Sequence, residues 1–181
     1  LLFAGLSTRI SYNMINHYRS VIDELDKYSY EDIIDLPEND LLIIVGKLGL
    51  GKTRVKYIFS MAKFIQNHTD ELSSFTNSDL IQLINDEVEG ASYKVAQCCV
   101  LYSRGYYCGV MPVDSGMVDM LLPCIGFNLS KGSIAHEEAR AELESLVSVV
   151  DLRPILEKNN YLDFINIPEG ADLTWWTHLV L

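Results

Sequence analysis

Apolar residues recur at helical spacing in segment after segment of this chain, and alternating strand patterns are scarce. Three segments carry such a stripe along one helical face: residues 11–27, 53–67 and 137–150. Residues 41–45 are five apolar residues in a row, which is too short a run to separate a strand from a buried helix. The sequence therefore predicts an all-α fold.

Polar residues at the starts of the stripes mark helix ends. Ser29 precedes a short helix, and Asp79 is expected to cap a helix that runs to Ile84. A buried helix is expected to begin at Met117 and to end near Pro123, because proline interrupts a helix. These signals divide the chain into short helices joined by turns.

The net charge of −11, from 14 basic and 25 acidic residues, argues on its face against a nucleic-acid partner. The charges are unevenly distributed, however. Residues 41–69 contain no Asp or Glu but hold Lys47, Lys52, Arg54, Lys56 and Lys63. The acidic residues gather in 23–40 and 137–144, where the plainer interpretation is that they solvate exposed helices. One basic face on an otherwise acidic protein is compatible with DNA binding.

Several other classes of protein are disfavoured by the composition. No apolar run reaches the roughly 20 residues that span a bilayer, so no membrane partner is expected. The first six residues lack the basic stretch of a signal peptide. Because both ends of the chain stop within apolar runs, we expect it to be a fragment of a longer protein.

The chain has four cysteines and four histidines, and neither set has the spacing of a metal site. Cys98, Cys99, Cys108 and Cys124 form no CxxC pair, and the histidines are far apart. Apolar neighbours indicate buried free thiols in a reducing, intracellular compartment. No protein-bound metal is expected.

The eight residues Gly46-Lys47-Leu48-Gly49-Leu50-Gly51-Lys52-Thr53 match the nucleotide-binding pattern G-x-x-x-x-G-K-[ST]. A nucleotide hydrolase of this kind also requires parallel strands, which the sequence does not indicate. The other interpretation is a turn between two helices, whose backbone donors face a DNA phosphate. In that case Gly49, Gly51, Lys52 and Arg54 are the candidate DNA-contacting residues.

A second glycine turn, Gly90-Ala91-Ser92, leads into an apolar helix with Lys94 in its first turn. The turn can bind a phosphate through its amides. The helix N-terminus and the apolar neighbours favour the neutral amine that a nucleophile needs, although most lysines of this kind are simply solvated.

Twenty residues later, Asp114 follows the run Met111-Pro112-Val113 and precedes Ser115-Gly116-Met117. Its plainest role is to cap the next helix, and capping also fixes the direction of the carboxylate. An amine and a carboxylate that converge on one cleft suit imine chemistry at a sugar carbon. Lys94 and Asp114 are therefore the candidate catalytic residues.

These segments together resemble the helix-hairpin-helix DNA glycosylases, the superfamily of endonuclease III and 8-oxoguanine DNA glycosylase. The resemblance covers nearly the whole chain. Residues 1–8 are similar to the opening L-L-S-A-Q-x-T, and residues 49–58 to G-L-x-x-x-K-A-x-x-I. Residues 88–96 lie on the hairpin L-P-G-V-G-x-K-T-A. Residues 94–98 and 111–114 match the 8-oxoguanine glycosylase version, K-V-A-D-C followed by V-P-V-D, most closely.

The resemblance implies two helical domains around a DNA-binding cleft, here residues 1–114 with the hairpin and residues 115–181 as an incomplete second domain. It places Lys94 on the lysine that attacks the sugar C1′, and Asp114 on the aspartate that assists. It implies a monomer that acts on double-stranded DNA containing a damaged base. No cofactor is implied, unless iron–sulfur cysteines lie beyond Leu181.

The chain departs from the family pattern at four positions. Glu89 replaces the proline of the hairpin, Ser92 its second glycine, Gly116 a frequent histidine, and Gly5 a frequent glutamine. We therefore expect a base-excision glycosylase with AP-lyase activity, and keep two alternatives: a DNA-binding module of this fold without catalysis, and the P-loop nucleotide hydrolase. The damaged base is not marked by the sequence. Trp175 and Trp176 could stack on a base, but the plainer expectation is that they pack their helix against the rest of the protein.

Overall fold

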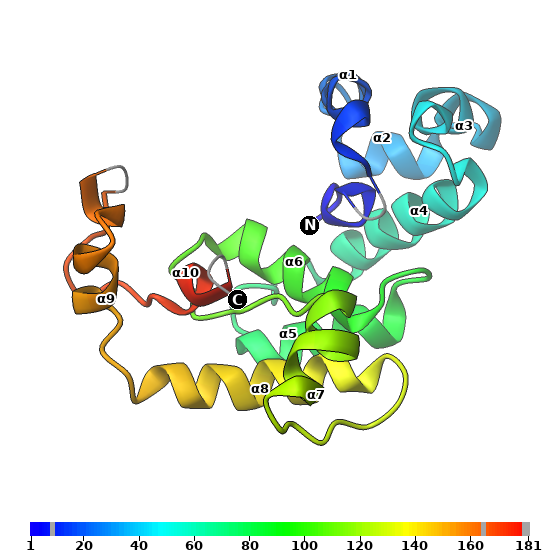
Figure 1. Ribbon diagram of the computed structural model, residues 1–181. Coiled ribbons are helices and arrows are strands. Elements are labelled where there is room, and N and C mark those ends of the chain that lie inside the picture. Colours follow the sequence, from blue (N-terminus) through cyan, green and yellow to red (C-terminus); the bar gives the residue numbers. More distant parts are fainter. Residues whose placement is uncertain (8–9, 164–165, 179–181) are drawn as a thin grey trace. The chain divides into compact units, whose positions relative to one another are not determined.

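The computed structural model describes residues 1–7, 10–163 and 166–178, and these form helices without a strand (Figure 1). The prediction of an all-α fold is therefore confirmed. The chain separates into two compact units, residues 1–100 and 101–181. The domains expected from the sequence instead divide at 114, after the Met111–Asp114 segment. Among the described residues, no helix combines the length and apolarity that crossing a bilayer requires.

The first unit consists of η1 (Ala4–Ser7), η2 (Tyr12–Met14), α1 (Ile15–Leu25), α2 (Tyr30–Asp35), α3 (Glu38–Val45), η3 (Gly46–Leu48), α4 (Gly51–His68), α5 (Asn77–Glu87) and most of α6 (Tyr93–Arg104). Helix α4 is its centre, because α2, α3 and α5 all pack against it. Ile58, Met61 and Ala62 of α4 are fully buried. Burial of a side chain such as Ile58 contributes about 1.5–3 kcal/mol.

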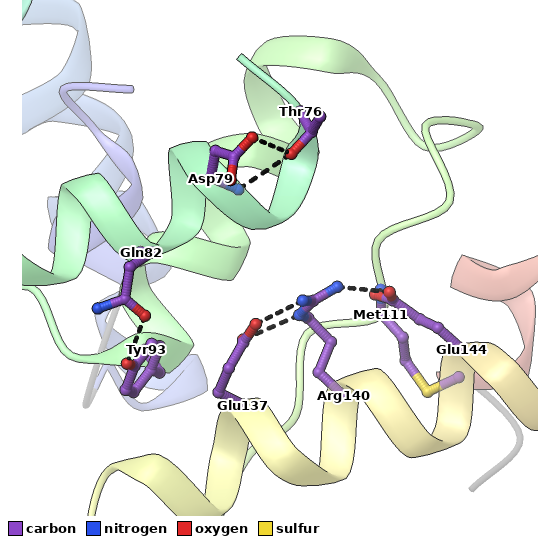
Figure 2. Close-up of polar contacts among 8 residues, drawn as sticks. All are labelled: Thr76, Asp79, Gln82, Tyr93, Met111, Glu137, Arg140 and Glu144. Carbon is purple, nitrogen blue, oxygen red and sulfur yellow. Dashed lines mark hydrogen bonds and ion pairs between the residues drawn. The ribbon is translucent and has the colours of Figure 1, made fainter.

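Two helix starts in this unit show how the sequence sets local structure. Ser29 caps α2, since its Oγ accepts the Asp32 N–H at 3.1 Å and Asp32 Oδ2 accepts the Ser29 N–H at 3.0 Å. The expectation that Asp79 caps α5 is wrong: the cap is Thr76, whose Oγ1 accepts the Asp79 N–H at 3.1 Å (Figure 2). The helix also extends to Glu87, beyond the expected end at Ile84.

The second unit consists of an extended segment up to Asp114, the π-helical turn η4 (Met117–Leu121), α7 (Leu122–Cys124), α8 (Ile134–Ser148), α9 (Arg153–Lys158), η5 (Tyr161–Asp163) and α10 (Thr174–His178). Its core is a cluster of buried side chains: Met111, Val113, Met117, Leu122, Ala139 and Leu143. The segment that leads to Asp114 is thereby packed against α8.

Candidate active site and DNA-contacting turns

Helices α5 and α6 form a hairpin whose turn contains the predicted phosphate-binding residues. Gly90 has φ +85°, a conformation that L side chains rarely adopt. The Ala91 N–H donates to the Val88 carbonyl at 3.0 Å, which closes the turn. The Tyr93 hydroxyl donates to Gln82 Oε1 at 2.8 Å, so the two helices are joined by side chains as well (Figure 2). The expected hairpin is present.

The hairpin turn is fixed to α4. The Glu89 N–H donates to Ser60 Oγ at 2.9 Å, and Lys56 Nζ lies 2.8 Å from Glu89 Oε1 in an exposed ion pair. This hydrogen bond to Glu89 raises the pKa of Lys56. Glu89, which stands where the glycosylase hairpin pattern has proline, thus places a carboxylate at the turn.

Lys94 lies in the first turn of α6 and is half-buried, while Gly90 and Ser92 are exposed. Ala91 is buried, and its N–H is already bonded within the turn. The next six residues, 95–100, are buried, which anchors α6 and fixes the backbone of Lys94. The first N–H groups of a helix have no acceptor within it, so this end of α6 is suited to an anion.

The second glycine turn lies between η3 and α4. Gly49 has φ +71° and Leu50 has φ +52°, and α4 starts at Gly51. A Cβ on Gly51 would lie 2.7 Å from Leu42 Cδ1, so glycine allows α3 and α4 to approach closely here. Lys52 is exposed and can meet a phosphate.

Arg54 does not have the role expected from the sequence. Its side chain is buried, with 4% exposed, and Nε donates to the Gly49 carbonyl at 2.9 Å. Nη1 donates to the Leu6 carbonyl at 2.8 Å, and burial lowers the pKa of the guanidinium. Arg54 therefore joins η1 to the turn before α4, and its burial excludes it from the DNA-contacting residues.

The P-loop alternative is wrong. A P-loop follows a β-strand, but residues 41–45 belong to helix α3, and Gly46–Leu48 is a 3₁₀ turn.

Asp114 lies in the second unit and caps the helical turn that follows it. Its Oδ1 accepts the Met117 N–H at 2.9 Å, and its carbonyl accepts the Val118 N–H at 3.1 Å. The capping role predicted for Asp114 is therefore confirmed. The residue is half-buried and lines an open hollow of about 550 Å³, together with Gly116, Met117, Met120, Leu121, Cys124 and His178.

Two departures from the family pattern have physical explanations. A Cβ on Gly5 would lie 2.4–2.7 Å from ring atoms of Tyr57, whose hydroxyl accepts the Gly5 N–H at 3.1 Å. A Cβ on Gly116 would lie 3.2 Å from Asp114 Oδ1, which is tighter than most contacts. Glycine at 5 admits the Tyr57 ring, and glycine at 116 leaves space beside the carboxylate.

The cysteines are only partly as expected. All four are free thiols, and Cys98 and Cys99 are buried, but Cys108 is half-buried and Cys124 is exposed. Burial raises the pKa of Cys99 to about 11. In the part of the chain that is described, no three His, Cys, Asp or Glu side chains gather as metal ligands.

The sequence did not reveal the residues that hold the Met111–Asp114 segment. Glu144 Oε1 accepts the Met111 N–H at 2.9 Å, and His136 Nδ1 donates to the Val113 carbonyl at 2.8 Å. Arg140 is 3% exposed and bonds to both Glu137 and Glu144 (Figure 2). The acidic run was expected to be solvated. An arginine four residues before a glutamate on the same helix is the signal that could have identified this network.

Trp175 forms ring contacts within the second unit. Trp175 stacks on Tyr106, with ring centroids 5.3 Å apart, and on His178 at 5.1 Å. These contacts agree with the packing role that was expected for Trp175. Thr8 and residues 179–181, which also belong to the family resemblance, lie outside the described residues.

Lys94 belongs to the first unit and Asp114 to the second, and their convergence on one substrate stays a prediction. The structure brings Gly90, Ser92 and Lys94 together in one hairpin. Gly49, Gly51 and Lys52 share the other turn.

Comparison with known proteins supports the fold. No family model matches the chain, and no curated protein matches it. Among solved structures, the chain is similar to MBOgg1 in complex with a low-affinity DNA ligand, with a TM-score of 0.54 and 18% sequence identity. The match covers 80% of this chain, which spans about half (52%) of the length of that protein. At this identity the likeness establishes the fold.

Proposed function

We propose that the protein is a DNA base-excision glycosylase with associated AP-lyase activity. The observation that carries the proposal is the α5–α6 hairpin with Lys94 in the first turn of its second helix. That hairpin occurs in a fold similar to that of a protein solved with DNA. Double-stranded DNA with a damaged base is the proposed substrate.

In the proposed reaction the damaged nucleotide is flipped out of the duplex, at a cost of a few kcal/mol. The Lys94 amine attacks C1′ while the glycosidic bond breaks, and the base leaves with the bonding electrons and takes up a proton. The Asp114 carboxylate stabilises the positive charge that develops on the sugar.

The lyase step follows from the same lysine. The amine and C1′ form a Schiff base as the C1′–O4′ bond breaks and O4′ takes up the proton that the amine loses. Loss of a C2′ proton then expels the 3′ phosphate by β-elimination, and water releases Lys94. The amine supplies the nucleophile and the carboxylate supplies the balancing charge, so we propose that no metal or redox cofactor takes part.

We propose that DNA phosphates bind at two places in the first unit. The exposed N-terminus of α6 at Gly90 and Ser92 supplies backbone donors, as helix N-termini do for anions. The start of α4 at Gly51 supplies a second set, next to the exposed ammonium of Lys52, whereas the Gly49 N–H already donates to the Gly46 carbonyl at 3.0 Å. These two sites would give the first unit local positive potential, although the net charge of the chain is −11.

A second candidate function is DNA binding without catalysis. The Lys56–Glu89 ion pair favours it, because the carboxylate of Glu89 weakens phosphate binding at the hairpin beside Lys94 and leaves the turn at exposed Lys52 as the DNA contact. Tight binding without turnover on a broad panel of lesions would support this alternative.

Borohydride trapping on labelled duplexes tests the proposal. The duplexes would carry 8-oxoguanine, an oxidised pyrimidine, uracil or an abasic site. Reduction of the Schiff base should join wild-type protein to at least one duplex. Lys94→Gln should lose the adduct, while Lys158→Gln, which changes an exposed lysine of α9, should keep it. Equal trapping by Lys94→Gln would show that another amine attacks.

A further inference from the structure

The segment 111–113 is buried, and its main-chain polar groups need partners away from water. Met111 and Val113 are fully buried in the core of the second unit, and Pro112 between them has no N–H to donate. The partners of the Met111 N–H and the Val113 carbonyl come from one helix, α8.

At the start of the segment, the acceptor is a carboxylate that is itself held in place. Glu144 Oε1 accepts the Met111 N–H at 2.9 Å, and its other oxygen accepts from Arg140. Arg140 is fixed in turn by Glu137, to whose Oε2 its Nε donates at 2.9 Å (Figure 2). Burial lowers the pKa of Arg140, but its bonds to the two carboxylates more than offset this, so its pKa lies above the usual value.

At the end of the segment, the contact lies one residue from the candidate catalytic carboxylate. His136 Nδ1 donates to the Val113 carbonyl at 2.8 Å. Asp114 follows directly, with its Oδ1 bonded to the Met117 N–H. Residues 136, 140 and 144 are four apart, so they lie along one face of α8.

We propose that α8 positions the Asp114 carboxylate by holding the main chain of residues 111–113 at both ends. Glu144, kept in place by Arg140, binds the first end, and His136 binds the second. These are positioning residues, since Glu144 and His136 bond to backbone atoms that precede Asp114. The inference rests on the proposed function, because such positioning matters to catalysis only if Asp114 acts in the reaction.

The first test measures base excision in single-turnover experiments with enzyme in excess, on the duplex that wild type cleaves best. Glu144→Met removes the acceptor and should slow excision by about 10- to 100-fold, the size expected from a misplacement of about 1 Å. Binding to an uncleavable abasic analogue should be unchanged. Glu144→Gln keeps an oxygen for the Met111 N–H and should recover most of the rate.

Two controls separate positioning from loss of stability. Leu143→Ala weakens the same core cluster without touching the contacts, and Glu142→Gln alters an exposed carboxylate of α8. Variants are compared at temperatures that give equal folded fractions. If Glu144→Met is no slower than Leu143→Ala, or if Glu144→Gln is as slow as Glu144→Met, the inference is overturned.

Amide hydrogen exchange gives a second readout that needs no catalysis. In Glu144→Met, the Met117 amide should exchange at least about tenfold faster, because its bond to Asp114 loosens, while Ile81 in the first unit stays protected. Unchanged protection at Met117 overturns the inference. If wild type excises no base, the proposed function fails, and this measurement still decides whether α8 positions Asp114.

Discussion

The two glycine turns of the first unit look alike in sequence, yet the structure uses their basic residues in opposite ways. Each turn has a glycine at positive φ, Gly49 or Gly90, and leads into a long helix. In the first turn the Arg54 side chain folds back onto the Gly49 carbonyl and is buried. In the second, Lys94 is half-buried at the helix start. A cation after a glycine turn can thus stabilise the turn or stay within reach of a ligand, and burial decides which.

Substitution of Arg54 should give the largest effect on stability in this comparison. Arg54→Met leaves the Gly49 and Leu6 carbonyls without their donor and should lower the free energy of unfolding by about 2–4 kcal/mol. Lys52→Met, at the same turn but exposed, should change it by less than about 0.5 kcal/mol. Urea denaturation measures both. Equal stability of the two variants would show that Arg54 does not hold the turn.

Alanine at the two glycines should separate turn stability from DNA binding. Gly49→Ala and Gly90→Ala force a side chain into positive φ, and each should cost about 1–2 kcal/mol of stability. The added methyl meets no atom within 4 Å at Gly49, and its nearest neighbour at Gly90 is Tyr57 Cβ at 3.7 Å. Strain is therefore matched between the two variants.

Their affinities for an abasic-analogue duplex should differ. Gly90→Ala distorts the hairpin and should weaken binding about tenfold, or about 1.4 kcal/mol. Gly49→Ala should weaken it less, since exposed Lys52 remains beside that turn. A larger loss in Gly49→Ala would make the turn before α4 the main DNA contact.

The smallest effect should come from the carboxylate at the hairpin. Glu89→Gln removes a negative charge beside the proposed phosphate site and frees Lys56, so affinity for the duplex should rise about two- to threefold at low salt. Glu142→Gln, which makes the same change of charge on α8, is the control. Fluorescence anisotropy at several salt concentrations measures both. An equal rise in affinity in the two variants would show that the net charge of the protein, and not the position of Glu89, causes the effect.

Local signals predicted the helices well, because apolar periodicity records which face of a helix is buried. The α5–α6 hairpin and the Asp114 cap also follow from short stretches of sequence. Residues 41–45 were ambiguous because five apolar residues fit a strand or a helix. The neighbouring α4 and the turn at Gly46 decide in favour of a helix.

Long-range contacts account for what the sequence did not predict. Arg54 donates a hydrogen bond to the Leu6 carbonyl, 48 positions away, and no local sequence pattern predicts that bond. The Glu144 bond to the Met111 N–H spans 33 positions. An acidic helix with a solvated face and one with a buried ion network have the same composition, so composition does not predict the bonds of Arg140 to Glu137 and Glu144.

The Glu144 and His136 hydrogen bonds that hold the segment before Asp114 are made to main-chain atoms of Met111 and Val113. The side chains at positions 111 and 113 can therefore be exchanged for other apolar groups without removing any bond that orients the segment. Packing of the core depends on the side chains of these residues, whereas alignment of the Asp114 carboxylate depends on their main chain. Substitutions at positions 111 and 113 would therefore be tolerated if residue 112 stays proline, which has no N–H to satisfy, and if α8 keeps Glu144 and His136.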